Sequence, residues 1–413
     1  MRSPVFRFLI IFLVTLTIID IYLYWSLFRA FKTLSLDQIF YFLLTAGSIV
    51  WIFIVISIFR FVILFRKNGG PELFQHINIY TGIILFVYCP KIIFLPFSIL
   101  ADFILALNAL SGISSRLLVY SAGLLVRGGL IIAPVASLLI LYGIIYGRFN
   151  FSIKKYHKIF KDLPDGFAGV KIIHFSDLHT GSLNGHQDRF ARIVRKVNEL
   201  KPDLIFFTGD MVNNFAEELD GWKDLWGELK ARLGKFAVLG NHDYGEYFKW
   251  KDKQQWRSNI DRLIEYIESM GFRLLMNESV KLNLDGQHID IIGVENWGLP
   301  PFSQYGDLQK AMKKAERDDF KILLSHDPSH WEVQVFGHTN IQLTLSGHTH
   351  GMQFGLRMGN IRWSPIRLRY PRWGGWYQEG DQSLHVSTGL GYIAVPFRFG
   401  IRPEVVLIQL DNK

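Results

Sequence analysis

The chain has 413 residues, of which 49% are hydrophobic and 15% aromatic, with a mean hydropathy of +0.18 and a formal net charge of +9. This length allows two or three domains, and this composition is too apolar for an ordinary soluble enzyme, so we expect a membrane part. The single cysteine, Cys89, excludes an intrachain disulfide framework and disfavours a thiolate metal site. Most of the excess positive charge lies in residues 1–150, which favours topology-setting charges over a nucleic-acid-binding surface.

Residues 1–150 contain four long apolar runs. They cover residues 8–28, 39–59, 79–101 and 128–147. A helix of about 20 residues spans a bilayer core, so we predict a membrane domain of about four transmembrane helices. Pro90, Lys91 and Pro96 interrupt the third run, and a re-entrant or interfacial segment is the alternative there. Asp20 and Lys91 are charges within apolar runs; they invite a transport role, but pairing or facing the bundle interior is the simpler interpretation.

The basic residues between these runs predict the orientation. With four spans, one side carries Arg2, Arg7, Arg60, Arg66, Lys67, Arg148, Lys154 and Lys155, and the other carries Arg29, Lys32, Arg116 and Arg127. Because the more basic side stays in the cytoplasm, we expect an integral membrane protein with a cytoplasmic C-terminal domain. If the third run does not cross, that domain moves to the other side. Residues 150–165 end in a turn signal, so a second domain is predicted over residues 151–413.

In this second domain, five β-rich apolar runs each lead into residues that can bind a metal. Residues 170–175 precede Asp177 and His179, 204–207 precede Asp210, 236–239 precede Asn241, His242 and Asp243, 322–324 precede His326 and Asp327, and 341–345 precede His348 and His350. Helical patterns at 190–200 and 260–270 separate some of these strands, and 273–284 and 287–294 are further predicted strands. Strand–helix alternation favours a largely parallel arrangement, so the five clusters should meet in one crevice.

The residue types in these clusters indicate divalent metal ions. Imidazole and carboxylate groups suit first-row ions such as Mn, Zn or Fe. The ligands are too many for one ion, and two ions about 3.5–4 Å apart need a bridging carboxylate. Asp210 is the predicted bridge, because Gly209 permits close backbone approach. Asp327 is either a supporting residue or a loop acid, and His338 is predicted to be a turn residue without a role.

These motifs resemble those of the calcineurin-like metallophosphoesterase superfamily. They are D-x-H at 177–179, G-D at 209–210, G-N-H-D at 240–243, a single histidine at 326 and G-H-x-H at 347–350. The resemblance covers about residues 168–412. It implies a four-layer α/β/β/α sandwich. Together with the four apolar runs, this predicts an N-terminal α-helical transmembrane bundle followed by an α/β metallophosphoesterase domain. In architecture alone, the chain is similar to the bacterial membrane-anchored branch, which includes enzymes that cleave the pyrophosphate of UDP-diacylglucosamine, and this similarity implies a location in a bacterial inner membrane.

The resemblance also implies roles for individual residues. One ion would be held by Asp177, His179, Asp210 and His350, and the other by Asp210, Asn241, His326 and His348. His242 corresponds to the catalytic histidine that faces the phosphate, Asp243 to the acid that orients it, and Asn241 and His242 to substrate-binding residues. The implied activity is that of a metal-dependent phosphoric ester hydrolase, which cleaves a phosphodiester or pyrophosphate bond with hydroxide activated by two divalent ions.

The segment 357–377 bears on the substrate. It contains Arg357, Arg362, Trp363, Arg367, Arg369, Tyr370, Arg372, Trp373, Trp376 and Tyr377, and no acidic residue. Arginine with aromatic residues suits a membrane interface and anionic headgroups, although a solvated loop is the alternative. We therefore expect membrane lipids as partners and a lipid-linked substrate, with no nucleic acid. The alternatives are a soluble substrate, such as a cyclic nucleotide or phosphoprotein, and a non-enzymatic scaffold or sensor, which complete motifs disfavour.

Overall fold

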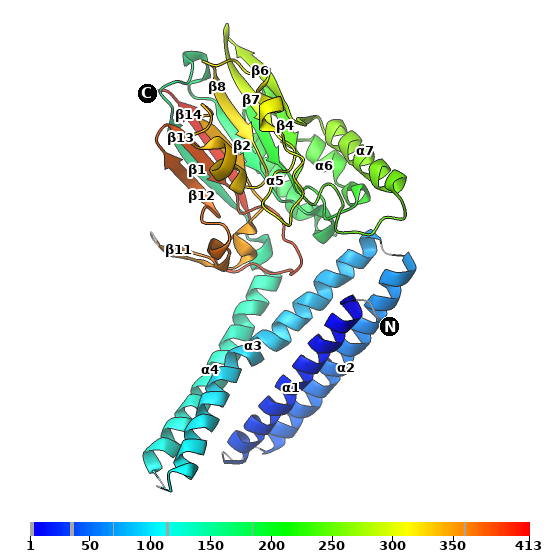
Figure 1. The fold of residues 1–413 in the computed structure, drawn as a ribbon, viewed down its shortest axis with the longest axis vertical. Coiled ribbons are helices and arrows are strands. Elements are labelled where there is room, and N and C mark those ends of the chain that lie inside the picture. The colour runs from blue at the N-terminus through cyan, green and yellow to red at the C-terminus, as the bar shows by residue number, and fades with distance from the viewer. Residues whose placement is uncertain (1–3, 34–36, 69, 113–114, 184, 359–360) are drawn as a thin grey trace. The chain divides into compact units, whose positions relative to one another are not determined.

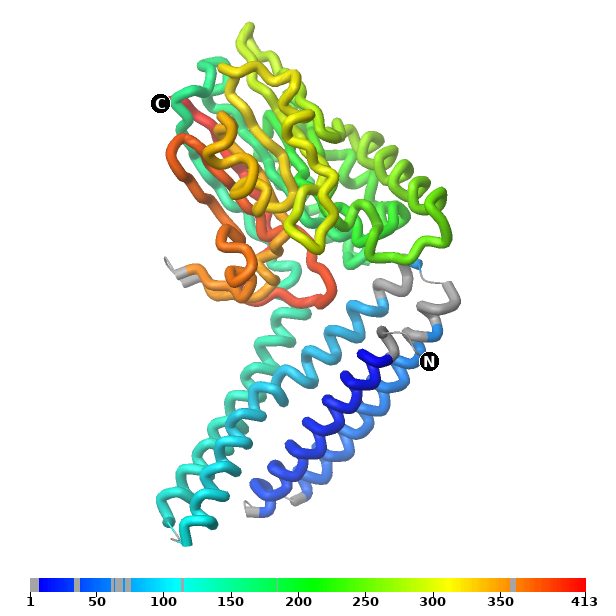
Figure 2. Tube along the Cα trace, viewed as in Figure 1, coloured from blue at the N-terminus to red at the C-terminus, as the bar shows by residue number. Residues whose placement is uncertain are grey.

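The computed structural model describes residues 4–33, 37–68, 70–112, 115–183, 185–358 and 361–413. The chain divides into two compact units (Figures 1 and 2). The helical unit comprises residues 1–68 and 79–142, and the α/β unit comprises residues 69–78 and 143–413. Arg2, which entered the orientation count, lies outside the described residues.

Four long helices form the helical unit. They are α1 (Pro4–Thr33), α2 (Asp37–Asn68), α3 (Pro71–Leu110) and α4 (Arg116–Ile145), and all four are long and apolar enough to cross a membrane. Helix α3 continues through Pro90 and Pro96, so the predicted third segment is one uninterrupted helix. Helix α4 begins well before the predicted residue 128, and Arg127 therefore lies inside a helix and not in a loop. The predicted cytoplasmic orientation stays a prediction.

Polar side chains connect α1 and α3. The Asp20 carboxylate accepts hydrogen bonds from Lys91 Nζ at 2.6 Å and from the Tyr88 hydroxyl at 2.9 Å. Further toward the C-terminal ends of both helices, the Ser26 and Ser98 hydroxyls lie 2.5 Å apart. A buried charge is costly unless it is paired, so these contacts hold the two helices together and support the pairing interpretation of Asp20 and Lys91.

The α/β unit contains two six-stranded sheets. The first has the order β1 (Ser152–Ile159), β14 (Glu404–Asp411), β2 (Lys171–Phe175), β3 (Leu204–Thr208), β4 (Gly234–Val238) and β5 (Arg273–Leu274). The second has the order β12 (Gly375–Glu379), β13 (Gln382–Val386), β9 (Leu343–Ser346), β8 (Phe320–Leu324), β7 (Gln287–Gly293) and β6 (Glu278–Leu284). Strands β2 to β5 are mutually parallel, and so are β7, β8, β9 and β13. The C-terminal strand, red in Figure 2, returns to pair with β1 and β2.

Successive residues of the strands face different apolar layers, as β periodicity requires. Phe206 belongs to the core between the two sheets, whereas Phe207 faces the outer core that α5 (Gln187–Glu199), α6 (Lys223–Gly227) and α7 (Lys253–Ser269) cover. In the second sheet, Leu324 lies in the shared core, and Leu323 faces α8 (Leu308–Met312) and the π-helix Trp331–Val335. The predicted α/β/β/α layering is therefore confirmed.

The prediction of one strand over residues 273–284 is wrong. The segment forms β5 and β6, which belong to different sheets. Between them, Asn277 has a φ of 57°, which is left-handed backbone that a strand cannot contain. The Asn277 side chain compensates, because its oxygen accepts from the Asp307 backbone N–H at 2.8 Å and its amide donates to Glu295 at 2.6 Å. The chain therefore crosses from one sheet to the other at this asparagine.

The core between the sheets should dominate the stability of the α/β unit. Phe206 is 0% exposed in that core, so Phe206→Ala is expected to destabilise the unit by about 3–5 kcal/mol. Leu368, 92% exposed, is the control, and Leu368→Ala should change stability by less than about 0.5 kcal/mol. Thermal unfolding in detergent, followed by tryptophan fluorescence, measures both; equal shifts would contradict the assignment of this core.

Candidate metal centre

The five strands with predicted ligands bring them to one place. Strands β2, β3 and β4 of the first sheet and β8 and β9 of the second each end just before their cluster. Two groups of side chains with ligand atoms within 4.8 Å of one another result: Asp177 with His179 and His350, and Asp210 with His326 and His348. Asn241, the remaining predicted ligand, contacts the second group through His348.

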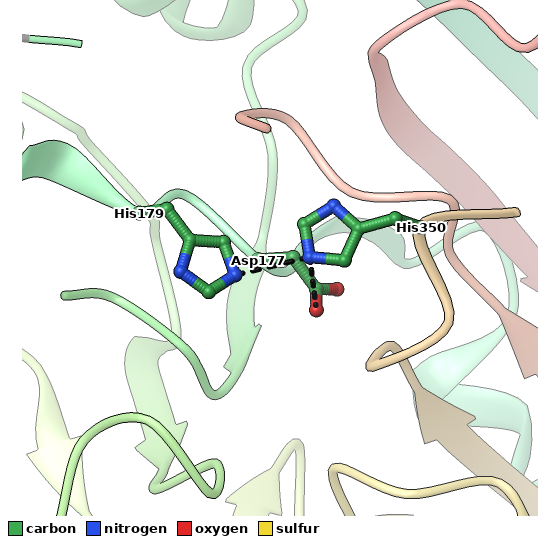
Figure 3. A group of neighbouring side chains, drawn as sticks. All are labelled: Asp177, His179 and His350. Carbon is green, nitrogen blue, oxygen red and sulfur yellow. Dashed lines mark hydrogen bonds and ion pairs between the residues drawn. The ribbon is translucent and has the colours of Figure 1, made fainter. Parts of the chain in front are cut away.

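In the first group, three side chains converge (Figure 3). The Nε2 atoms of His179 and His350 lie 3.0 Å apart, and His350 Nε2 lies 3.3 Å from Asp177 Oδ1. All three residues are buried. The Asp177 carboxylate also accepts the His348 backbone N–H at 2.9 Å, so the strand-end turns after β2 and β9 are tied together.

The second group contains the aspartate that the sequence predicted as a bridge. Asp210 Oδ2 lies 3.2 Å from His326 Nε2, and the same oxygen lies 3.6 Å from His179 Nε2 in the first group. His348 Nδ1 lies 2.9 Å from Asn241 Oδ1 and 3.3 Å from His326 Nε2. One carboxylate oxygen thus stands between the two groups, where a bridging ligand would have to be.

The residues present fit divalent ions. Four imidazoles, two carboxylates and one amide oxygen form a donor set typical of first-row metals. Two ligand nitrogens each about 2.1 Å from one ion lie about 3.0–3.4 Å apart, which matches the nitrogen–nitrogen distances of 3.0 and 3.3 Å in the two groups. Without a cation, these nitrogen pairs would face each other with at most one proton between them.

The backbone at this centre is strained. Five of the predicted ligands have positive φ values: Asp177 (53°), His179 (49°), Asp210 (58°), His348 (71°) and His350 (50°). Such non-glycine conformations cost on the order of 1–3 kcal/mol each, and they persist only where surrounding contacts hold them. Their concentration at the strand ends is a structural sign of a functional site.

Close approach explains two of the neighbouring glycines. A Cβ at Gly347 would lie 1.8 Å from Ser176 Oγ and 2.3 Å from Asp177 Oδ2. Gly209 has a φ of 91°, and a Cβ there would lie 2.4 Å from the Gly240 backbone nitrogen. Any larger residue would therefore push apart the turns that carry Asp210 and His348.

Burial and neighbouring charges shift the titration of the ligands in the absence of an ion. Burial raises the pKa of the Asp177 carboxyl to about 7 and lowers the pKa of the His179 imidazole to about 3. Burial also opposes charge on His326, but the Asp210 carboxylate outweighs it and raises the pKa of His326 to about 10. The centre therefore attracts positive charge beside Asp210, and a bound cation would take the place of that proton.

The two predicted catalytic residues have separate partners. His242 Nδ1 lies 2.8 Å from the Asn213 carbonyl oxygen, and its backbone N–H donates to Asp210 Oδ1 at 2.9 Å. The Asp243 carboxylate accepts backbone N–H groups of Gly240, Asp210 and Met211, each at 2.8 Å. Among the described residues, Asn213 thus orients the His242 imidazole, while Asp243 fixes the turn that carries Asp210.

Three residues at the centre were not predicted as site residues. The Tyr370 hydroxyl lies 2.8 Å from His348 Nε2, and Arg398 Nη2 lies 3.3 Å from His350 Nδ1. The Asn241 amide donates to the Tyr247 hydroxyl at 2.8 Å. Tyr370 and Arg398 reach the centre from loops without a ligand motif and so have no local sequence signal, whereas Tyr247 follows the G-N-H-D motif in the same loop. The sequence left the role of Asp327 open. Its Oδ2 atom lies 3.5 Å from His348 Nε2, so Asp327 supports this predicted ligand.

Comparison with known proteins gives consistent results. The family model described as calcineurin-like phosphoesterase matches residues 170–352. An uncharacterized metallophosphoesterase of Bacillus subtilis, YkuE, is 32% identical over 254 residues, covering 60% of this chain and 82% of that protein. A Bos taurus transmembrane protein with metallophosphoesterase domain is 30% identical, and the match covers 60% of this chain and 54% of that protein. A Campylobacter jejuni metallophosphoesterase, Cj0846, is 24% identical over 99% of both chains.

The chain therefore belongs to the calcineurin-like metallophosphoesterase family. It is a metal-dependent phosphoric ester hydrolase, and members of this family use divalent metal ions, for which the two groups of aspartate and histidine provide ligands. The four long apolar helices, together with a transmembrane relative, identify it as a membrane protein.

The position of Asp210 between the two groups predicts the effect of removing its charge. Asp210→Asn is expected to lower the bound metal from about two ions per chain to one or none, because a neutral amide offsets the repulsion of two cations poorly. Elemental analysis of the purified full chain measures this. Asp261→Asn, at an exposed position on α7, is the matched control and should retain all metal. Full metal content in Asp210→Asn would contradict a shared ligand.

The Tyr370 hydroxyl is expected to hold His348 in place. Tyr370→Phe removes this hydrogen bond and should reduce metal affinity about 10-fold, because partners of ligating histidines fix the ring orientation. The control is Tyr377→Phe in the same segment, where the lost hydroxyl contacts the Gly374 backbone and no ligand histidine among the described residues. Competition with a fluorescent chelator measures both affinities, and equal affinities in the two variants would contradict this role.

Proposed function

We propose that this protein is a two-metal phosphoesterase that hydrolyses a phosphodiester or pyrophosphate bond in a lipid-linked substrate at the membrane surface. The two ligand groups around Asp210 support the two-metal part of this proposal. The lipid-linked part depends on one observation, an exposed apolar and basic surface next to the metal centre. The alternative, a soluble substrate, is tested below.

The residues of the centre would have different roles in hydrolysis. When bound, the divalent ions would lower the pKa of water and neutralise charge on the phosphoryl oxygens. The Asn213 carbonyl can only accept a hydrogen bond, so His242 Nδ1 carries a hydrogen and Nε2 is left for the substrate. His242 would then contact a phosphoryl or leaving oxygen, and Asn241 would help to position the phosphate.

The exposed surface lies in the segment that follows His350. Its apolar members are Met352, Phe354, Leu356, Trp363 and Leu368, and its basic members are Arg362, Arg367 and Arg369, all exposed. We call these eight residues the interfacial surface. Strands β10 (Leu356–Met358) and β11 (Ile361–Trp363) form a hairpin that places Leu356 opposite Trp363. Apolar side chains with guanidinium groups suit the boundary between acyl chains and anionic headgroups.

Contacts within the α/β unit connect the interfacial surface to the last residues of α4. The Arg398 backbone N–H donates to the carbonyl of Gly143, a residue in the last turn of α4, at 3.3 Å. Phe397 lies against Gly143, and the Phe397 and Phe354 rings are 6.3 Å apart. These contacts join the interfacial surface to the residues at the end of an apolar span, which supports contact of this surface with lipid.

The substrate class is tested with the full chain in detergent. We expect release of product from lipid-linked phosphoesters in mixed micelles and loss of that activity in Asp210→Asn. Turnover of soluble diesters or cyclic nucleotides alone would overturn the lipid proposal while leaving the phosphoesterase intact. No turnover of any phosphoester by metal-loaded protein would overturn the enzymatic function itself.

Variants of the interfacial surface separate the two substrate classes further. Trp363→Ser with Leu368→Ser should raise KM for the micellar substrate about 10-fold or more and leave soluble diester turnover unchanged, because each side chain contributes about 1.5–3 kcal/mol on burial. Val333→Ser, which removes an exposed apolar residue outside this surface, is the control. An unchanged KM in the double variant would contradict contact with lipid.

A further inference from the structure

A cavity of about 220 Å³ lies within the helical unit, between α1, α3 and α4. Small residues make room for it, namely Ala30, Ala101, Ala122 and Gly123. A Cβ at Gly123 would meet no atom within 4 Å, so this part of α4 faces open space. The remaining lining is mostly apolar, with the exception of three charged side chains and one serine. The metal centre contributes no residue to it.

The charges in this cavity do not balance. Arg29 pairs with Asp102, which also accepts a hydrogen bond from the Tyr22 hydroxyl at 2.7 Å. The Arg29 guanidinium stacks 3.6 Å from the Trp25 ring centre. Arg127 lines the same cavity, and among the described residues it has no ion pair or hydrogen-bond partner. Two guanidinium groups and one carboxylate leave one uncompensated positive charge.

This positive charge lies on a membrane-spanning helix. Arg127 is about 16 Å along α4 from Arg116, at 1.5 Å per residue, and α4 belongs to an apolar span. Ionisable residues in such segments are costly, face the bundle interior or a cavity, and generally have a partner. The cavity therefore needs an anion near Arg127, and its apolar walls of Val119, Val126 and Leu130 suit a hydrocarbon chain beside that anion.

We propose that this cavity binds an anionic phospholipid, with the phosphate on Arg127 and Arg29 and an acyl chain along α4. The Asp102 carboxylate holds Arg29 in place and disfavours ligands with more than one acidic group. A phosphate diester with two tails carries the single negative charge that the cavity lacks. This site is separate from the metal centre, so it binds lipid without hydrolysing it.

The experiment measures lipid binding to the full chain in detergent by native mass spectrometry. The probes are phosphatidylglycerol, phosphatidylcholine and inorganic phosphate. We expect phosphatidylglycerol to bind at least 10-fold more tightly than phosphatidylcholine, and inorganic phosphate not to bind this cavity. Arg127→Gln should remove the preference, whereas Arg116→Gln, an exposed arginine at the start of the same helix that does not line the cavity, should keep it. The metal-centre variant Asp210→Asn should bind lipid normally, so this test is independent of catalysis.

A second variant separates binding from folding. Gly123→Leu places a side chain in the cavity, where there is space for it, and leucine is a better helix former than glycine by roughly 1 kcal/mol. The variant should therefore be at least as stable as the parent chain but lose selective binding. Equal preference in Arg127→Gln and Arg116→Gln, or retention in Gly123→Leu, would overturn the proposal. Binding of inorganic phosphate as tight as that of phosphatidylglycerol would show an anion site and not a lipid site.

Discussion

One carboxylate oxygen connects the two halves of the metal centre. Asp210 Oδ2 is within 3.6 Å of imidazole nitrogens from both ligand groups, and these groups come from the ends of strands in two different sheets. Three features position the ligands around Asp210: the packing of the two sheets, the parallel direction of their inner strands and the tight glycine turns. Because each group combines residues from both sheets, a displacement of either sheet would move histidines away from the aspartates they face.

The position of Asp210 is itself held by a buried acid. The Asp243 carboxylate accepts backbone N–H groups from the turns that follow β3 and β4. These contacts stabilise the left-handed backbone conformation of Asp210, which would otherwise be unfavourable. The structure thus gives Asp243 contacts with the backbone, where the resemblance implied that it orients His242. The difference has a physical cause: a fully buried carboxylate is best satisfied by several N–H donors, and the strand ends provide them.

The sequence predicted the convergence of the ligands because it depends on local patterns, whereas the four layers were implied by the resemblance of the motifs to a known family. A short apolar strand followed by a ligand-type residue can be recognised without knowing the partner, and parallel strands then place such residues at one edge. Tyr370 and Arg398 could not be predicted in this way, since only long-range packing of loops brings them to His348 and His350. The start of α4 was missed because Arg127 and the neighbouring glycines interrupt its apolar run, and the break at Asn277 depends on contacts with Glu295 and Asp307.

The pairing of Asp20 with Lys91 has a consequence for the biogenesis of the protein. The two charges come from the first and third helices, and each alone would cost about 2.5–3.5 kcal/mol at the centre of an inserted segment. The N-terminal helix emerges from the ribosome with its acid still unmatched, and the lysine is synthesised only after the second helix. The first helix must therefore remain near the insertion machinery until the third helix arrives to complete the pair.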